Sequence, residues 1–163
     1  MNPTCLTRLD RFRRERRAKV YAEALAAMRR FQEVPYKVWR RPASDAKTRA
    51  EIGQEHSDAT AGVAYHQVLL RMDSEVVGAA YWDLWSQVRV TRKANRVLAW
   101  KSPVITSDEA MAENPPFERD DADVELELCL LAMRREMSLL GPLLRRDTRR
   151  RLQYQRAVRG RAT

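Results

Sequence analysis

Apolar residues recur at helical spacing along most of this chain, and that spacing constrains the fold more than any other feature. Over residues 77–98 the interval stays at about 3.5 residues for three heptads, so one side of a long helix is expected to face a core. The expected seam consists of Val77, Tyr81, Leu84, Val88, Thr91, Asn95 and Leu98. Such a seam is typical of a helical bundle, with a coiled coil as the alternative.

A first helix is expected over about residues 6–40. Its apolar seam consists of Val20, Ala24, Ala27, Phe31, Val34 and Val38. Residues 11–19, which precede this seam, are nearly all charged. Because Pro35 lies inside the pattern, a kink or break is expected near residues 32–34.

Two more helices are expected, over about residues 45–72 and 121–140. Ser44 or Asp45 can cap the first of them, and Ser74 can cap the helix that follows. The inward positions expected in residues 45–72 are Ala46, Ala50, Gly53, Val63, Val68, Leu69 and Met72. Those expected in residues 121–140 are Leu126, Leu130, Met133, Met137 and Leu140, widened by Val124, Leu128 and Leu131.

The chain has only five Gly, and most of its seven Pro fall between these helical patterns. The sequence therefore predicts an all-α fold, an antiparallel bundle of four main helices with a kinked basic N-terminal helix. Residues 1–142 are expected to form the bundle domain, with residues 1–19 as a basic extension of the first helix. Residues 143–163 are expected to form a basic fifth helix or a frayed tail.

The charge distribution bears on partners rather than on the fold. The net charge of +9 favours polyanions such as nucleic acid, an anionic membrane surface or an acidic protein. Residues 108–127 hold nine acidic residues, whereas both ends of the chain are basic. No apolar stretch approaches the roughly 18 residues of a membrane span, and no signal-peptide core is present. We therefore expect no membrane insertion and a location in the cytoplasm, or in a particle assembled there.

Residues that would support catalysis or metal binding do not form a recognisable set. His56 and His66 are ten residues apart, about 15 Å along a helix, and point in different directions. Cys5 and Cys129 lack metal-ligand spacing, and Cys129 is expected to be a buried, unreactive thiol. Acidic residues 120–127 lack the glycine and the spacing of a calcium loop. The sequence predicts no enzyme, no metal, no cofactor and no small-molecule substrate.

Two arginine-rich tracts are candidate sites for binding a polyanion. The residues are Arg11, Arg13, Arg14, Arg16, Arg17 and Lys19 in the first tract, and Arg145, Arg146, Arg149, Arg150, Arg151 and Arg156 in the second. Arginine pairs well with phosphate, and such contacts would give a salt-dependent affinity for any sequence. The alternative is that both tracts are solvated helix ends or meet an acidic surface of a neighbour.

Five aromatic residues are candidate interface anchors or stacking platforms: Tyr36, Trp39, Trp82, Trp85 and Trp100. The alternative is that they close the ends of the bundle core. Trp82 and Trp85 fall beside the seam of residues 77–98, which places much of the aromatic core on that helix.

Three segments carry a resemblance to a known group of proteins. Residues 14–25 (RERRAKVYAEAL), 73–80 (DSEVVGAA) and 132–137 (AMRREM) are similar to elements of a diffuse set of uncharacterised helical proteins. That set is frequent in high-GC actinobacteria and their phages. Many of its members place a membrane helix before the basic segment, and this chain has none. The resemblance implies a helical bundle and supplies no activity and no functional residues.

Two functions are consistent with these observations. The first is a non-enzymatic helical protein that acts by binding another protein or by self-association, in a phage or an assembled particle. The second is an accessory protein that binds nucleic acid without sequence preference through its arginine tracts. The long amphipathic helices and the segregated charge favour the first function.

Overall fold

The computed structural model describes residues 3–107, 115–117 and 122–138, with side chains from residue 11 onward. Within these residues the chain forms helices and no strand. The helices are α1 (Pro3–Trp39), α2 (Ala46–Asp73), α3 (Glu75–Lys101) and α5 (Asp123–Met137). The predicted all-α bundle is confirmed. The expected fifth helix or tail over 143–163 lies outside the described residues.

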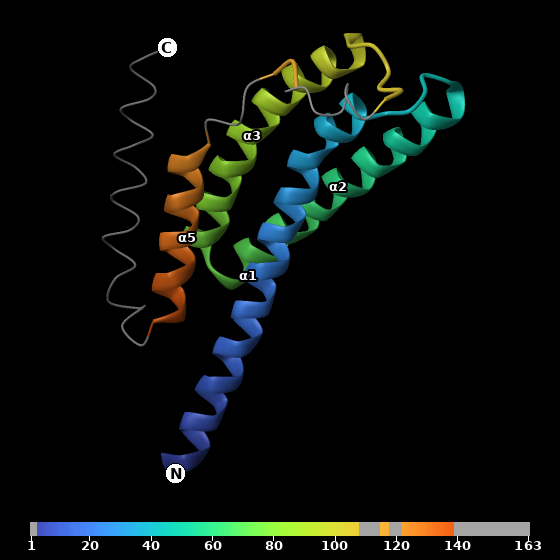
Figure 1. Ribbon diagram of the computed structural model, residues 1–163. Helices are drawn as coiled ribbons and strands as arrows, with labels where there is room; N and C mark the ends of the chain where they lie inside the picture. The colour runs from blue at the N-terminus through green and yellow to red at the C-terminus, as the bar shows by residue number, and fades with distance from the viewer. Residues whose placement is uncertain (1–2, 108–114, 118–121, 139–163) are drawn as a thin grey trace, which may run out of the picture.

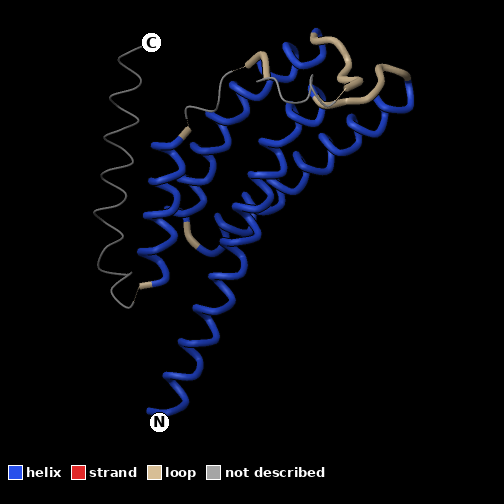
Figure 2. Tube along the Cα trace, viewed as in Figure 1, coloured by secondary structure: helices blue, strands red, loops and turns tan. Residues whose placement is uncertain are grey.

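Successive helices run in alternating directions, and only short turns join α1 to α2 and α2 to α3 (Figures 1 and 2). α3 packs against each of the other three helices, whereas α1 and α5 share only a few contacts. α2 and α3 diverge from their shared turn, and α1 crosses between them (Figure 1). The bundle is therefore a three-helix unit with α5 laid on the outer side of α3.

α1 follows its predicted seam closely. Ala24, Ala27, Phe31, Val34 and Val38 are all buried. α1 continues through Pro35 and ends four residues later at Trp39. The helix is therefore unbroken at the place where a kink or break was expected. Pro35 removes only one backbone hydrogen bond at this place, and its ring is fully buried.

The seam of α3 is correct in its first half and drifts in its second. Val77, Tyr81, Leu84 and Val88 are buried as predicted. Beyond them Asn95 is also buried as predicted, but Arg92 and Ala99 are buried as well, and Leu98 is 42% exposed. A straight helix makes one turn every 3.6 residues, whereas the predicted seam assumed 3.5 residues per turn. The buried face therefore rotates away from the predicted seam by about 20° per heptad. The drift shows bundle packing rather than a coiled coil.

The inward face predicted for α2 was wrong. Val63 is buried, but Val68 is 58% exposed and Met72 is 80% exposed. Ala46, Ala50 and Gly53 are also exposed. The buried positions of α2 are Val63, Gln67 and Leu70. These residues lie in the half of α2 that is nearer the turn to α3. Packing against the core in that half determines which face of α2 is buried.

The face predicted for α5 was right in part: Met133 is buried, and Leu128 and Met137 pack against the core. The centre of the buried face, however, lies about one residue away from the predicted one. Its buried residues are Glu125, Cys129, Ala132, Met133 and Glu136. Leu126 and Val124, which were expected to face the core or flank it, are exposed. Leu140 lies outside the described residues. Small side chains and two glutamates therefore occupy much of the surface that α5 turns toward the core.

Cys129 lies in the main core, as predicted, and is fully buried. Burial raises the pKa of its thiol from the ordinary 9.0 to about 12. In a Cys5→Ser variant at pH 8, a thiol reagent such as DTNB should label Cys129 about a thousandfold more slowly than in urea, because the thiolate is the reacting form. Labelling of the native protein within tenfold of the urea rate would contradict this burial.

Ser74 is the single residue between α2 and α3, and it caps both helices. Its backbone N–H donates to the carbonyl oxygen of Leu70 at 2.8 Å, which ends α2. Its hydroxyl oxygen accepts from the backbone N–H of Val77 at 3.4 Å, which begins α3. The predicted role of Ser74 as a helix cap is confirmed, and so is that of Asp45, which accepts from the N–H of Thr48 at 2.7 Å.

The short turn brings the first turn of α3 against the last turn of α2. A Cβ placed on Gly78 would lie 2.8 Å from Cα and 2.9 Å from N of Arg71. The carbonyl oxygen of Gly78 accepts from Nε2 of the buried Gln67 at 3.2 Å. Gly78 is therefore the residue that permits this close approach of two backbones.

At the opposite end, Arg41 joins the C-termini of α1 and α3. Its Nη1 donates to the carbonyl oxygens of Val38 at 2.9 Å and Ala99 at 2.8 Å. Its Nη2 donates to those of Trp100 at 3.2 Å and Ser102 at 2.6 Å. The last carbonyls of a helix have no partner within the helix, so one guanidinium satisfies the ends of two helices.

The third nitrogen and the flat face of the Arg41 guanidinium also have partners. Its Nε donates to Oγ of Ser44 at 2.9 Å, and the group lies 5.0 Å from the ring centroid of Trp100. Arg41 is only 3% exposed. Burial, and then the charge of Arg49, lower the pKa of Arg41 from its ordinary value. In a continued helix, the backbone N–H of residue 42 would donate to the carbonyl oxygen of Val38. That residue is Pro42, which has no N–H, and the side chain of Arg41 donates to this oxygen instead.

Candidate functional site

The N-terminal part of α1 projects beyond the rest of the bundle (Figure 1). We call residues 11–19 the arm, because Tyr21 is the first buried residue among the side chains described for α1. Arg11, Arg13, Arg14, Arg16 and Lys19 of the arm are exposed. At about 100° per residue, these positions are distributed around the whole helix. The arm therefore presents positive charge on every side.

Two arginines of the arm are engaged within the molecule. Arg11 donates from Nε to Glu15 at 2.8 Å, an exposed pair one helical turn apart. Arg17 is half-buried and donates from Nε to Oδ1 of Asp73 at 3.0 Å. Burial alone would lower the pKa of Arg17, but the hydrogen bond and charge of Asp73 raise it overall. Arg13, Arg14, Arg16 and Lys19 extend from the arm into solvent.

The base of the arm is tied to the turn between α2 and α3. Tyr21 donates its hydroxyl proton to Oδ2 of Asp73 at 2.9 Å, so Asp73 holds two residues of α1. Burial, and then Asp73, raise the pKa of Tyr21. Nη1 of Arg17 also donates to the backbone oxygen of Glu136 at 3.4 Å, and the hydroxyl of Ser74 donates to its carboxylate at 2.9 Å. The base of the arm is therefore held by contacts to both α2 and α5.

A groove of about 660 Å³ lies between the base of the arm and the end of α2. Its lining residues are Arg13, Arg16, Arg17, Val20 and Glu23 of α1 and Tyr65, Leu69, Met72 and Asp73 of α2. Tyr65 is 62% exposed, and Val68 extends the same apolar surface along α2. An exposed apolar surface next to a cationic helix is a surface of the kind that binds other proteins.

The sequence assigned this apolar surface to the core. Val68, Leu69 and Met72 were expected to face inward, and Tyr65 was not singled out. The signal that could have found them is their number, because α2 carries more large apolar residues near its end than one helix face can bury. Their position three and four residues apart marks a second face.

The second arginine tract, residues 145–156, lies outside the described residues. The contacts given above therefore concern the first tract alone. Arg145, Arg146, Arg149, Arg150, Arg151 and Arg156 stay predicted polyanion-binding residues.

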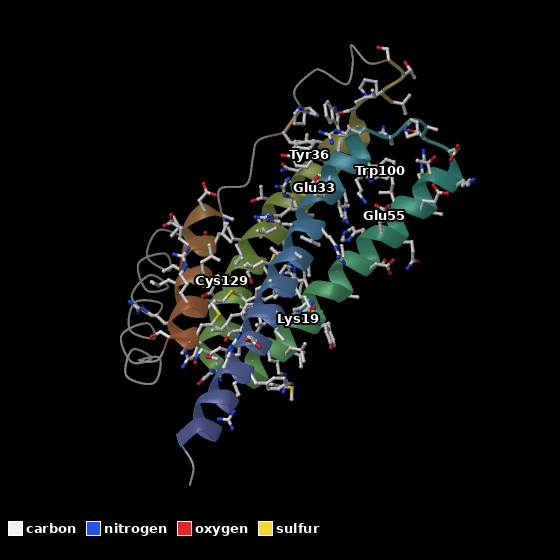
Figure 3. The ribbon with its side chains drawn as sticks, turned by 60° about the horizontal axis from the view of Figure 1, so that its bottom comes forward. Lys19, Glu33, Tyr36, Glu55, Trp100 and Cys129 are labelled. Carbon is white, nitrogen blue, oxygen red and sulfur yellow. The ribbon has the colours of Figure 1, made fainter. Side chains whose placement is uncertain are left out.

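The five candidate aromatic residues divide between core and surface. Trp39 is buried in a small cluster with Val34, Val38, Ala99 and Phe117 at the end remote from the arm. Tyr36 and Trp100 pack against that cluster and lie far from Lys19 (Figure 3). Trp82 is 45% exposed and meets the half-buried Trp85 edge to face at 5.1 Å between ring centroids.

Neither histidine belongs to a cluster of ligands. Nδ1 of His56 lies 3.0 Å from the hydroxyl of Thr60, and the ring of His66 meets that of Tyr65. Among residues 3–107, 115–117 and 122–138, no three His, Cys, Asp or Glu side chains could together hold a metal ion. In the same part of the chain no helix has the length and apolar character needed to cross a membrane.

No protein-family model matched the chain, and neither did any curated protein or solved structure with which it was compared. The resemblance to helical proteins of actinobacteria and their phages therefore stays a prediction. The candidate site must be interpreted from its own geometry.

Proposed function

We propose that this protein is a non-enzymatic helical interaction module that binds an acidic, amphipathic segment of a partner protein. The observation that carries the proposal is the exposed apolar surface of α2 beside the arm. Tyr65, Val68 and Met72 are each more than half exposed on one helix. Burying such side chains against a partner would remove apolar area from water, at about 25 cal/mol per Å².

Charge selects the kind of partner. Arg13 and Arg16 line the groove, and Arg14 and Lys19 extend the positive surface along the arm. Glu23 and Asp73 also line the groove, but Asp73 is engaged by Arg17 and Tyr21. An occupant with apolar side chains on one helical face and carboxylates on its flanks would match both properties of the surface.

The proposal can be tested with a designed peptide. The probe is a fluorescent helical peptide with Leu at positions i, i+3, i+4 and i+7, Glu on the flanks of this face and Ala elsewhere, and its companion has Lys in place of Glu. We expect binding of the acidic peptide alone, and a loss of about tenfold or more in affinity with Tyr65→Ser and Met72→Ser together. Fluorescence anisotropy measures both.

The matched control replaces two exposed apolar residues of α3, Val90→Ser with Val97→Ser. This pair should leave the peptide affinity within about twofold of the unsubstituted protein, since neither residue lines the groove. Equal binding of the acidic and the basic peptide would contradict the proposal, as would full affinity of the Tyr65 and Met72 variant. Light scattering on the same samples reports whether a second copy of the chain occupies the surface instead.

A second candidate function is binding of nucleic acid without sequence preference. The observation that favours it is the distribution of exposed cations around the whole arm, which suits a phosphate backbone better than a one-sided docking surface. The same anisotropy measurement with a fluorescent DNA duplex distinguishes the two. Tight duplex binding whose salt slope falls by about three in Arg13→Gln, Arg14→Gln, Arg16→Gln, with no peptide binding, would make nucleic acid the partner.

A further inference from the structure

A cleft of about 610 Å³ lies between α1, α2 and α3, away from the groove. α3 supplies one wall through Trp85, Arg89, Val90, Arg92, Lys93 and Arg96. α1 supplies Phe31, Val34 and Pro35, and α2 supplies His56 and Thr60. Its volume is within the range of pockets that hold small molecules.

The charge of this cleft is one-sided. Four of its lining residues are Arg or Lys, and none is Asp or Glu. The sequence from residue 84 to residue 107 contains no acidic residue, so the second half of α3 cannot balance these charges itself. Arg89, Lys93 and Arg96 stand three and four residues apart, where like charges on a helix repel each other. The helix dipole favours cations only in the last turn, near Lys101.

Two of these cations are held in place by aromatic rings. The guanidinium of Arg89 lies 5.5 Å from the ring centroid of Trp85. That of Arg92 lies 5.3 Å from the ring centroid of Tyr36, and Arg92 is only 7% exposed. Arg92 is thus part of the wall of the cleft, whereas Arg89 is exposed to it. An exposed arginine held by a ring loses little freedom when it binds, which favours an anionic ligand at Arg89.

The remainder of the cleft is apolar and aromatic. Phe31 and Pro35 are buried beneath it, whereas Trp85 is half-buried and Val90 is 67% exposed. A bare anion would use only the cationic wall. A ligand that combines a phosphate group with a flat or apolar part would use both walls, and arginine pairs with phosphate through two parallel hydrogen bonds.

We propose that the cleft between α1, α2 and α3 binds a small organic phosphate. The phosphate lies against Arg89, Lys93 and Arg96, and the apolar part lies against Trp85 and Val90. This site is separate from the groove and does not depend on the function proposed for it.

Calorimetry with ATP, pyrophosphate and adenosine as probes tests the proposal at 150 mM salt. We expect half-saturation by ATP below about 0.1 mM, weaker binding of pyrophosphate and none of adenosine. Arg89→Gln with Lys93→Gln should weaken ATP binding at least tenfold. Both side chains are exposed, so the fold should not depend on them.

The matched control is Arg13→Gln with Arg16→Gln, which removes the same formal charge from the arm. This variant, and Tyr65→Ser with Met72→Ser, should bind ATP within twofold of the unsubstituted protein. If the Arg13 and Arg16 variant weakened ATP binding as much as the Arg89 and Lys93 variant, the effect would be one of diffuse charge, and the proposal would be overturned. Absence of ATP binding at 1 mM would also overturn it, and so would adenosine or pyrophosphate binding as tightly as ATP.

Discussion

Replacing Arg41 by lysine is expected to lower the free energy of unfolding by about 3 kcal/mol, although the charge is kept. The guanidinium donates to four carbonyl oxygens from two helices and to Oγ of Ser44. A lysine has three donors on one atom and cannot reach groups that are arranged around a planar fork. Arg41→Met should cost more, about 4 kcal/mol, because it leaves every one of these acceptors without its donor.

Urea denaturation measures the loss, and the neighbouring residue supplies a control. Arg40 is exposed and its guanidinium lies 5.8 Å from the ring centroid of Trp39. Arg40→Lys should change the free energy of unfolding by less than about 1 kcal/mol. If Arg41→Lys were as stable as Arg40→Lys, Arg41 would not be what joins the ends of α1 and α3.

Replacing Gly78 by alanine should destabilise the protein by about 2–3 kcal/mol, which reverses the usual effect of this substitution in a helix. A methyl group at residue 78 would meet Cα and N of Arg71 at 2.8 and 2.9 Å. Those atoms belong to the backbone of α2, so relief requires the two helices to move apart. That movement would also strain the hydrogen bond from Gln67 to the carbonyl oxygen of Gly78.

The matched control for this prediction is Gly53→Ala in α2. A Cβ at residue 53 meets nothing within 4 Å, so alanine there should stabilise the protein by up to about 1 kcal/mol. The two substitutions are chemically identical and should have opposite signs in the same urea experiment. A stabilising effect at both positions would mean that the turn between α2 and α3 is looser than described.

The helices and their approximate ends could be predicted from the sequence because each had strong local signals. The seam of α1 and the caps at Asp45 and Ser74 involve residues close together in the chain. The face of α2 and part of that of α5 were predicted wrongly for a different reason. In α5 the core takes Ala132 and Glu136, which carry little or no hydrophobic signal, and it leaves Leu126 exposed.

The candidate sites depended even more on contacts between distant residues. The arm was recognised from composition alone, but the groove requires Tyr65 and Met72 to lie beside Arg13 and Arg16, which only the packing of α2 on α1 determines. Arg41 lies between the two segments expected to be helical, residues 6–40 and 45–72, and was not singled out. Its role depends on carbonyls some 60 residues away, at the end of α3.

The arm is the same unbroken helix that passes through the core, and this continuity has a consequence for recognition. Its arginines are already spaced as a bound helix would need them, so a partner does not have to order this segment first. From the buried Tyr21 to Arg11 the helix rises by about 15 Å. Asp73 fixes the direction of the helix at its base. A partner bound to the arm is therefore held at a fixed distance and angle from the bundle, because a rigid helix and not a flexible linker joins the two.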